Sequence, residues 1–239
     1  GRVTLLTSGT TGDPSIVEHT WASLFTMRRA RSDRPVNWLL TYQPGTYAWF
    51  QMVTLVLFVP NQELTVGEDR SPVGLMEAAL RSRVTAVSGT PTFWRMVMLQ
   101  FPSDSLRAMN LRQITLGGEA VDQSILDRLR SLYPDARITH IYASTEAGAA
   151  IVVGDGREGF PAAWIQDGDQ ELASGDGPQL KIRDGVLWIR SPFAMRSGWI
   201  NSGDLCEVRG DRVIILGREQ TSFINVGGAK VPAHEVERV

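Results

Sequence analysis

The sequence predicts an α/β protein in which a mostly parallel sheet with flanking helices is followed by a small antiparallel β module. Up to about residue 150, short apolar runs alternate with helix-like stretches, which is the pattern of a parallel sheet. Beyond that point, Asp184-Gly185 and Arg209-Gly210-Asp211 each separate two runs of alternating polarity, which is the pattern of hairpins. We therefore expect residues 1–150 to form the α/β part of a large domain and residues 151–217 an antiparallel β subdomain.

The first expected elements are a short buried strand at Val3–Thr7, a helical stretch around Trp21–Arg31 and a strand at Asn37–Thr41. Residues Gly45–Phe58 are expected to form a buried helix, because this apolar run is too long for one ordinary strand. The longest apolar stretch, Tyr47–Val59, is too short to cross a bilayer and contains polar residues. No transmembrane segment is therefore expected.

Capping signals place the next helices. Pro72 follows Ser71 and Pro91 follows Thr90, so helices are expected over residues 71–82 and 90–100. Asp122 is the expected N-cap of a third helix over residues 123–133. Strands are expected between and after these helices, at residues 85–89, 112–118 and 137–142.

Composition and charge narrow the class of protein. The 239 residues include 24 basic and 26 acidic side chains, so the basic excess of a nucleic-acid binder is missing and no nucleic-acid partner is expected. Cys206 is the only cysteine, which excludes a disulfide within the chain and favours a reducing, cytoplasmic location. The three histidines are widely spaced, so a zinc site is not expected.

The most specific local feature is the segment LLTSGTTGDPS, in which a predicted strand leads into a loop of hydroxyl residues and glycines. Glycine allows positive φ angles, and successive backbone N–H groups in such a loop form a concave site for an anion. The loop lacks the Gly-Lys-Ser/Thr ending of a Walker sequence. A polar turn without a ligand stays open as the alternative. The candidate phosphate-binding residues are Thr7, Ser8, Gly9, Thr10, Thr11 and Gly12.

The segment TSGTTGDP resembles the phosphate-binding loop of the adenylate-forming superfamily, which includes acyl-CoA synthetases, aryl-acid ligases, luciferases and peptide-synthetase adenylation domains. The resemblance extends over essentially the whole chain, as further motifs follow in the family's order. The family usually has a lysine just after the second glycine or two residues later. Here Asp13 and Ser15 stand in those places, which removes one expected phosphate contact.

The segment GGEAVD is similar to the family's Gly-Gly-Glu segment, which lines the adenine and acyl pockets. The resemblance implies that Gly118 and Glu119 contribute to the nucleotide site. The alternative is a strand-to-helix turn in which Asp122 serves only as the N-cap.

The segment IYASTEAG is similar to the family's Tyr-Gly-x-Thr-Glu element, with an alanine in place of the glycine. The resemblance implies that Tyr142 stacks on adenine, that Thr145 contacts a phosphate and that Glu146 holds magnesium. Ala143 and Ser144 lie between them and are included in the expected nucleotide site. A solvated loop carboxylate is the alternative for Glu146.

Two later segments complete the resemblance. INSGDL is similar to the family's Thr-Gly-Asp element, so Asp204 is expected to accept hydrogen bonds from the ribose hydroxyls, and Arg218 is expected to contact the ribose as well. Residues 218–239 resemble the family's hinge, with Gln220 at the hinge position, and the start of a further C-terminal domain. The family's catalytic lysine is expected in that further domain, and Lys230 does not match it.

The resemblance implies activation of a carboxylic acid by ATP and Mg²⁺, followed by transfer to CoA or to the phosphopantetheine of an acyl or peptidyl carrier protein. Amino-acid-activating relatives place an aspartate in the stretch that here reads QPGTYAWFQMVTLV, which has no acidic residue. A fatty or aryl acid is therefore favoured. An amino-acid-activating domain and a non-catalytic nucleotide-binding or regulatory domain stay open as alternatives.

Overall fold

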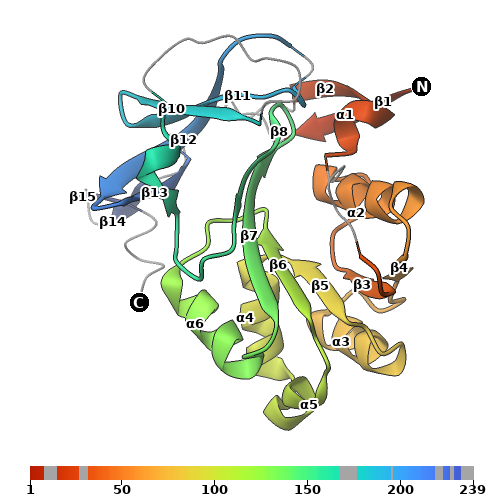
Figure 1. Cartoon of the computed structure of the whole chain (residues 1–239). Helices are drawn as coiled ribbons and strands as arrows, with labels where there is room; N and C mark the ends of the chain where they lie inside the picture. Colours follow the sequence, from red (N-terminus) through yellow and green to blue (C-terminus); the bar gives the residue numbers. More distant parts are fainter. Residues whose placement is uncertain are drawn as a thin grey trace.

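A computed structural model describes residues 1–7, 15–26, 32–166, 177–194, 196–218, 223–226 and 229–232. Its two larger sheets have six strands in the order β4-β3-β5-β6-β7-β8 and five strands in the order β10-β11-β12-β13-β9. Helices flank the six-stranded sheet, and the five-stranded sheet lies beyond its β7–β8 end (Figure 1). The predicted fold class, a mostly parallel α/β part followed by an antiparallel module, is confirmed.

The six-stranded sheet is parallel except for its last strand. Strands β3, β4, β5, β6 and β7 run in one direction, whereas β8 returns antiparallel to β7. Two of these strands, β4 and β8, were not predicted. Because parallel strands end at one edge of a sheet, the residues after β3, β5, β6 and β7 gather there. The strands are β3 (Val36–Leu40), β4 (Gln62–Thr65), β5 (Ala86–Gly89), β6 (Gln113–Gly117), β7 (Arg137–Ser144) and β8 (Gly148–Val153).

The helices begin where the capping residues predicted. The side chains of Ser71, Thr90 and Asp122 each accept a hydrogen bond from a backbone N–H in the first turn of their helix. The buried helix predicted in the apolar run is also present, although its last two residues are exposed. A short helix, α5, was not predicted. The helices are α2 (Tyr47–Phe58), α3 (Pro72–Arg81), α4 (Pro91–Gln100), α5 (Ser103–Ala108) and α6 (Gln123–Leu132).

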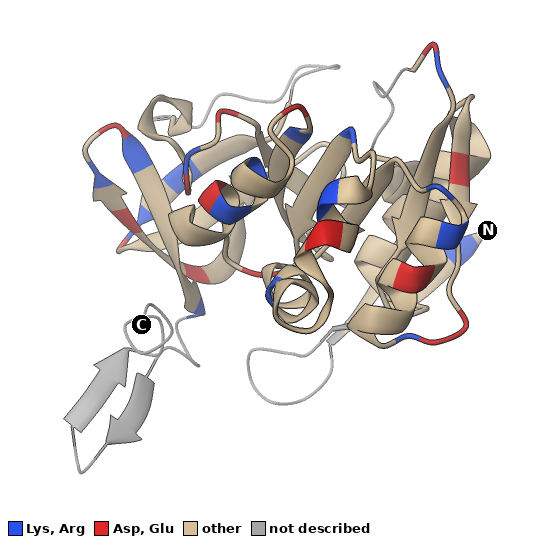
Figure 2. Ribbon diagram, turned by 90° about the horizontal axis from the view of Figure 1, so that it is seen from below, with Lys and Arg blue, Asp and Glu red and all other residues tan. Residues whose placement is uncertain are grey.

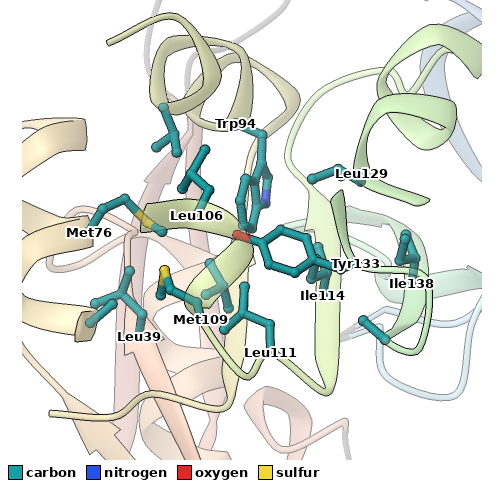
Figure 3. Close-up of a cluster of buried hydrophobic side chains, with 14 of the residues drawn as sticks. Leu39, Met76, Trp94, Leu106, Met109, Leu111, Ile114, Leu129, Tyr133 and Ile138 are labelled. Atoms are coloured by element: carbon teal, nitrogen blue, oxygen red, sulfur yellow. The ribbon is translucent and has the colours of Figure 1, made fainter. Parts of the chain in front are cut away.

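The main core lies between the six-stranded sheet and helices α3, α4 and α6. Trp94 of α4 is fully buried at its centre, and its ring meets that of Tyr133 edge to face, with 6.1 Å between centroids (Figure 3). Leu39 of β3, Ile114 of β6 and Ile138 of β7 contribute from the sheet. Close packing of this kind is what holds the strand ends of the sheet in fixed relative positions.

The N-terminal segment differs from the prediction. Strand β1 (Arg2–Thr7) pairs antiparallel with β2 (Ser15–Thr20) in a sheet of its own, so it is not a buried strand of the parallel sheet. Its residues alternate, with Arg2 and Thr4 exposed and Leu5 buried, and such alternation fits a half-buried hairpin. The following helix, α1, covers only Trp21–Leu24; Phe25 and Thr26 lie outside it, and residues 27–31 are not among those described.

The antiparallel module contains both predicted hairpins. Strands β10 (Gln179–Arg183) and β11 (Val186–Arg190) form the first, and β12 (Ile200–Arg209) and β13 (Arg212–Arg218) form the second. Strand β9 (Phe160–Pro161) pairs with β13 and forms one edge of the sheet, and a short 3₁₀ helix (Ala162–Trp164) follows it. A separate hairpin joins β14 (Phe223–Val226) to β15 (Ala229–Pro232). None of the helices in the described ranges is both long and apolar enough to cross a membrane.

A buried arginine ties the antiparallel module to the segment that leaves β8. The guanidinium of Arg212, on β13, donates to Asp155 Oδ2 at 2.6 Å and to the carbonyls of Glu158, Arg157 and Gly159 at 2.8–3.1 Å. Arg212 is 5% exposed. His140 of β7 lies beside it, with Nε2 at 3.1 Å from the Arg157 carbonyl. These bonds fix how the second sheet sits relative to β7.

Candidate functional site

Three residues that the sequence singled out meet where the two sheets adjoin. Tyr142 lies on β7, whereas Asp204 and Arg218 are cross-strand partners on β12 and β13. The Tyr142 hydroxyl donates to Asp204 Oδ2, and Arg218 Nε lies 3.2 Å from Asp204 Oδ1. Asp204 is 7% exposed, whereas the Arg218 side chain is 43% exposed. The arrangement joins an aromatic ring, a buried carboxylate and a cation that remains open to solvent.

Local hydrogen bonds fix the backbone at Asp204. The Asp204 N–H donates to Ser202 Oγ at 3.1 Å, and Ser202 Oγ donates in turn to the Leu187 carbonyl on β11 at 2.7 Å. Asn201 Oδ1 accepts from the Gly203 N–H at 2.8 Å. Polar residues of this kind favour turns because they bond to nearby backbone groups. The start of β12 is therefore anchored on the neighbouring strand.

Burial also sets the protonation of the groups around Asp204. Burial and the adjacent Asp204 carboxylate raise the pKa of Tyr142 far above its ordinary value, so the phenol stays protonated and acts as a donor. The same two causes raise the pKa of Cys206 to about 12. Because only the thiolate is a good nucleophile, Cys206 is not a nucleophile near neutral pH.

A second group forms at the turn after β7. The backbone N–H of Ala147 donates to Ser144 Oγ at 3.0 Å, which closes the turn that presents Thr145 and Glu146. Both of these residues are half-buried. The carbonyl of Thr145 lies 2.7 Å from Nε2 of His19, a residue that sequence analysis did not place in the site.

The Gly118–Glu119 segment follows β6 at the same edge of the sheet. Gly118 has φ of +84°, a conformation that favours glycine. Glu119 Oε2 accepts a hydrogen bond of 2.9 Å from the backbone N–H of Thr92, in the first turn of α4. Asp122 forms an ion pair with Arg95 in addition to capping α6. Helix capping therefore accounts for both acidic residues, and a nucleotide contact for Gly118 and Glu119 remains a prediction.

Part of the predicted site lies outside the described residues. Thr7 is the last residue of β1, and the rest of the candidate phosphate loop, Ser8–Gly12, is not described. The same is true of Gln220 at the predicted hinge. Ala143 is described, and it packs against the small cluster of Leu5, Leu24 and Tyr47.

The turn can supply a single carboxylate, that of Glu146, to a magnesium ion. Within the described residues, no three His, Cys, Asp or Glu side chains gather in a way that could hold a metal ion. Magnesium bound with a phosphate substrate needs only one or two carboxylates, because water and phosphate oxygens supply the other ligands. The half-buried turn thus fits a magnesium ion that arrives with a nucleotide better than a preformed metal cage.

Comparison with known proteins gives a consistent result. A family profile described as AMP-binding enzyme matches residues 3–198. Among curated proteins, the chain is 24% identical to the medium/long-chain-fatty-acid–[acyl-carrier-protein] ligase FadD10 of Mycobacterium tuberculosis, covering 98% of this chain and 50% of that protein. It is 25% identical to the p-hydroxybenzoic acid–AMP ligase FadD22 of the same species, covering 98% of this chain and 36% of that protein.

Solved structures show the same fold. A variant of E. coli MenE with bound OSB-AMS superposes with a TM-score of 0.69 at 20% identity, covering 99% of this chain and 52% of that one. ATP-bound MatB from Rhodopseudomonas palustris gives a TM-score of 0.67 at 19% identity, covering 98% of this chain and 51% of the MatB chain. The chain spans about half the length, or less, of the relatives it matches.

Proposed function

Because the chain belongs to the AMP-binding enzyme family, we propose that the polypeptide carrying it uses ATP to activate a carboxylic acid as an acyl-adenylate. The acyl group then passes to a thiol, either of CoA or of a carrier protein's phosphopantetheine. The observation that carries the proposal is the meeting of Tyr142 from one sheet with Asp204 and Arg218 from the other. The relatives support it, since FadD10 and FadD22 are named as ligases of a fatty acid and of p-hydroxybenzoic acid.

In this proposal the two groups of residues bind different parts of ATP. Asp204 accepts hydrogen bonds from the ribose hydroxyls, Arg218 donates to the ribose, and Tyr142 lies against the adenine. The loop from Thr7 to Gly12 binds the β- and γ-phosphates, Thr145 contacts a phosphate, and Glu146 holds magnesium. Gly118, Glu119, Ala143 and Ser144 border the nucleotide. Residues 1–150 are then the α/β part of the family's large domain, residues 151–217 its β subdomain, and residues 218–239 the hinge with the start of the C-terminal domain.

The chemistry has two steps. A carboxylate oxygen of the acid attacks the α-phosphorus of ATP, the bond from that phosphorus to the bridging oxygen breaks, and pyrophosphate leaves. A thiol sulfur then attacks the acyl carbon, losing its proton, and AMP leaves. Positioning of the reactants and compensation of phosphate charge supply most of the acceleration in chemistry at phosphorus. Magnesium, when bound, would neutralise part of that charge, whereas the protein residues hold the nucleotide in line with the acid.

We further propose that the acid has an uncharged fatty or aryl tail. Helix α2 reads YAWFQMVTLVLF and carries no acidic residue that could bind the ammonium group of an amino acid. The relatives support both kinds of tail, because the named substrate of FadD10 is a fatty acid and that of FadD22 is an aryl acid. Both classes belong in the test.

The test is acid-dependent exchange of radiolabelled pyrophosphate into ATP, measured with the full-length natural polypeptide that carries these 239 residues. The panel contains fatty, aryl and amino acids, with and without EDTA. Exchange with a fatty or aryl acid that is lost in EDTA is expected. Glu146→Gln should reduce exchange at least tenfold at limiting Mg²⁺, whereas Asp104→Asn, a change at a fully exposed carboxylate, should leave it unchanged.

Two results would favour a different function. Exchange only with amino acids would assign the chain to the amino-acid-activating branch. Binding of Mg·ATP without exchange for any acid would favour the non-catalytic alternative, which is motivated by Asp13 and Ser15 in the places where the family usually has a lysine.

A further inference from the structure

His19 links two parts of the molecule that are far apart in sequence. It lies on β2 and is fully buried, with 0% of its surface exposed. Its Nε2 is 2.7 Å from the carbonyl oxygen of Thr145, 126 residues further along the chain. The bond therefore connects the N-terminal hairpin directly to the turn that presents Thr145 and Glu146.

The hydrogen-bond partners of His19 decide which of its ring nitrogens carries a hydrogen. A carbonyl oxygen only accepts hydrogen bonds, so Nε2 must carry the hydrogen. Burial lowers the pKa of His19, whereas the Thr145 carbonyl and the Glu146 carboxylate act in the opposite direction. In the neutral ring Nδ1 carries no hydrogen and lies 3.0 Å from Ser23 Oγ, whose single hydrogen can go either to Nδ1 or to the Thr20 carbonyl, also 3.0 Å away. Ser23 is itself fixed, because its hydroxyl oxygen accepts from the Thr20 N–H at 3.0 Å.

Apolar contacts around His19 keep the hairpin close to the same turn. The His19 ring lies tilted against the ring of Tyr47, with 5.6 Å between centroids. Leu5 of β1 and Leu24 of α1 pack with Tyr47, and Ala143 of β7 joins this cluster. The apolar cluster sets the distance between the hairpin and β7, and the directional bond from His19 sets the orientation of the Thr145 peptide.

We propose that His19 is a positioning residue that orients the Thr145–Glu146 turn toward the phosphates and the magnesium ion of ATP. This inference rests on the proposed function, since it assumes that Thr145 and Glu146 serve ATP. It makes a specific prediction, because the contacts to the ribose come from Asp204 and Arg218, which His19 does not touch. Loss of His19 should therefore weaken binding of Mg·ATP, which brings the magnesium ion and two further phosphates, much more than binding of AMP.

The experiment measures dissociation constants for Mg·ATP and for AMP by calorimetry, in the full-length natural polypeptide and in three variants. His19→Leu removes both ring nitrogens and should weaken Mg·ATP binding roughly tenfold, as expected for loss of one buried hydrogen bond. AMP binding should stay within about twofold, the scatter of such measurements. His19→Gln retains an N–H donor of similar reach and should restore most of the loss. Ser23→Ala removes the partner of Nδ1 and should give a smaller effect in the same direction.

Four outcomes would overturn the inference. Equal loss of affinity for Mg·ATP and AMP would show that His19 acts only on general stability. Unchanged binding of both ligands by His19→Leu would show that the bond has no role in positioning. If His19→Leu does not fold, the test passes to Ser23→Ala. A Ser23→Ala variant with no selective loss of Mg·ATP affinity would then overturn the inference. A parent protein that binds no Mg·ATP would overturn the proposed function together with this inference.

Discussion

The hydroxyl of Tyr142 donates a hydrogen bond to the carboxylate of Asp204, and this bond joins the six-stranded sheet to the five-stranded one. Arg218 approaches the other oxygen of the same carboxylate. A carboxylate offers about four acceptor positions, so a carboxylate with these two donors can still accept hydrogen bonds from two ribose hydroxyls. The position of Asp204 thus serves both the contact between the sheets and the proposed nucleotide site.

Asp204→Asn should weaken binding of ATP and of AMP equally. The substitution keeps the shape of the side chain but removes its charge, and hydrogen bonds to charged groups contribute about 1.5–3 kcal/mol. Affinity should fall by roughly 10- to 100-fold, measured by calorimetry. Asp104→Asn is the control, because that carboxylate is fully exposed. A loss confined to ATP would contradict the assignment of Asp204 to the ribose.

Arg212→Met should destabilise the protein by about 3 kcal/mol, because it removes a buried guanidinium that makes several hydrogen bonds, each contributing about 0.5–1.5 kcal/mol. The change leaves Asp155 and three backbone carbonyls without their buried donor. The measurement is urea denaturation followed by tryptophan fluorescence. The matched control is Arg157→Met, because Arg157 forms a two-pronged ion pair with Asp211 in which both side chains are exposed. An equal loss in the free energy of unfolding for Arg212→Met and Arg157→Met would contradict the claim that burial of Arg212 makes its hydrogen bonds important.

Stability should decrease as the pH falls below about 6.5, the ordinary pKa of histidine. Burial lowers the pKa of His140 and of His19, so the unfolded state binds protons in this range that the folded state does not. Unfolding is therefore favoured as pH falls from 6.5 toward the lowered values, and this destabilisation is absent above pH 6.5.

The measurement is the free energy of unfolding between pH 8 and about 5.5, where carboxylates with ordinary or lowered pKa values stay mostly ionised. His140→Gln should flatten the dependence, since glutamine does not titrate. The charged groups that face His140 are Asp155 and Arg212, and both are retained in this variant. A variant with an unchanged slope would show that His140 is not one of the titrating groups.

Glu119→Ala should lower stability by about 1 kcal/mol, the typical effect of removing a helix cap. The reason is the loss of the acceptor for the Thr92 N–H at the start of α4. Glu119→Gln keeps an oxygen acceptor and should retain most of the stability, as measured by thermal unfolding. A loss of ATP affinity in Glu119→Gln without loss of stability would instead support the nucleotide contact implied by the family resemblance.

Local signals predicted much of the fold. Ser71, Thr90 and Asp122 cap helices because their side chains bond to N–H groups only a few residues away. The Asp184-Gly185 turn likewise needs no distant partner, because both residues adopt positive φ. The polarity of neighbouring residues was therefore sufficient to locate these elements.

Long-range pairing was less predictable. Strand β1 was expected in the parallel sheet, and nothing in its own residues shows that its partner is β2, which begins at Ser15. Strand β8 was also missed, because nothing in its own residues shows that the chain folds back on β7. A pattern along one strand indicates burial but does not identify the neighbouring strand.

The candidate site, too, depends on long-range contacts that local signals do not predict. Tyr142 and Asp204 are 62 residues apart, and only the family resemblance placed them together before the structure did. His19 and Arg212 were not singled out, because their partners are distant backbone carbonyls, which have no sequence signature. Buried polar residues that bond to backbone are thus the functional candidates that sequence analysis alone misses most easily.

Gly148 ends the turn that presents Thr145 and Glu146, and it limits how this part of the protein can vary. Its φ is +77°, and a β-carbon built there would lie 2.8 Å from the β-carbon of Phe193 and 3.3 Å from the Tyr47 hydroxyl. Helix α2, the β7–β8 turn and the segment after β11 therefore meet at one point with no space for a methyl group. A homologue with alanine at this position must also change its backbone angle and move its equivalent of Phe193, so the two positions are expected to vary together.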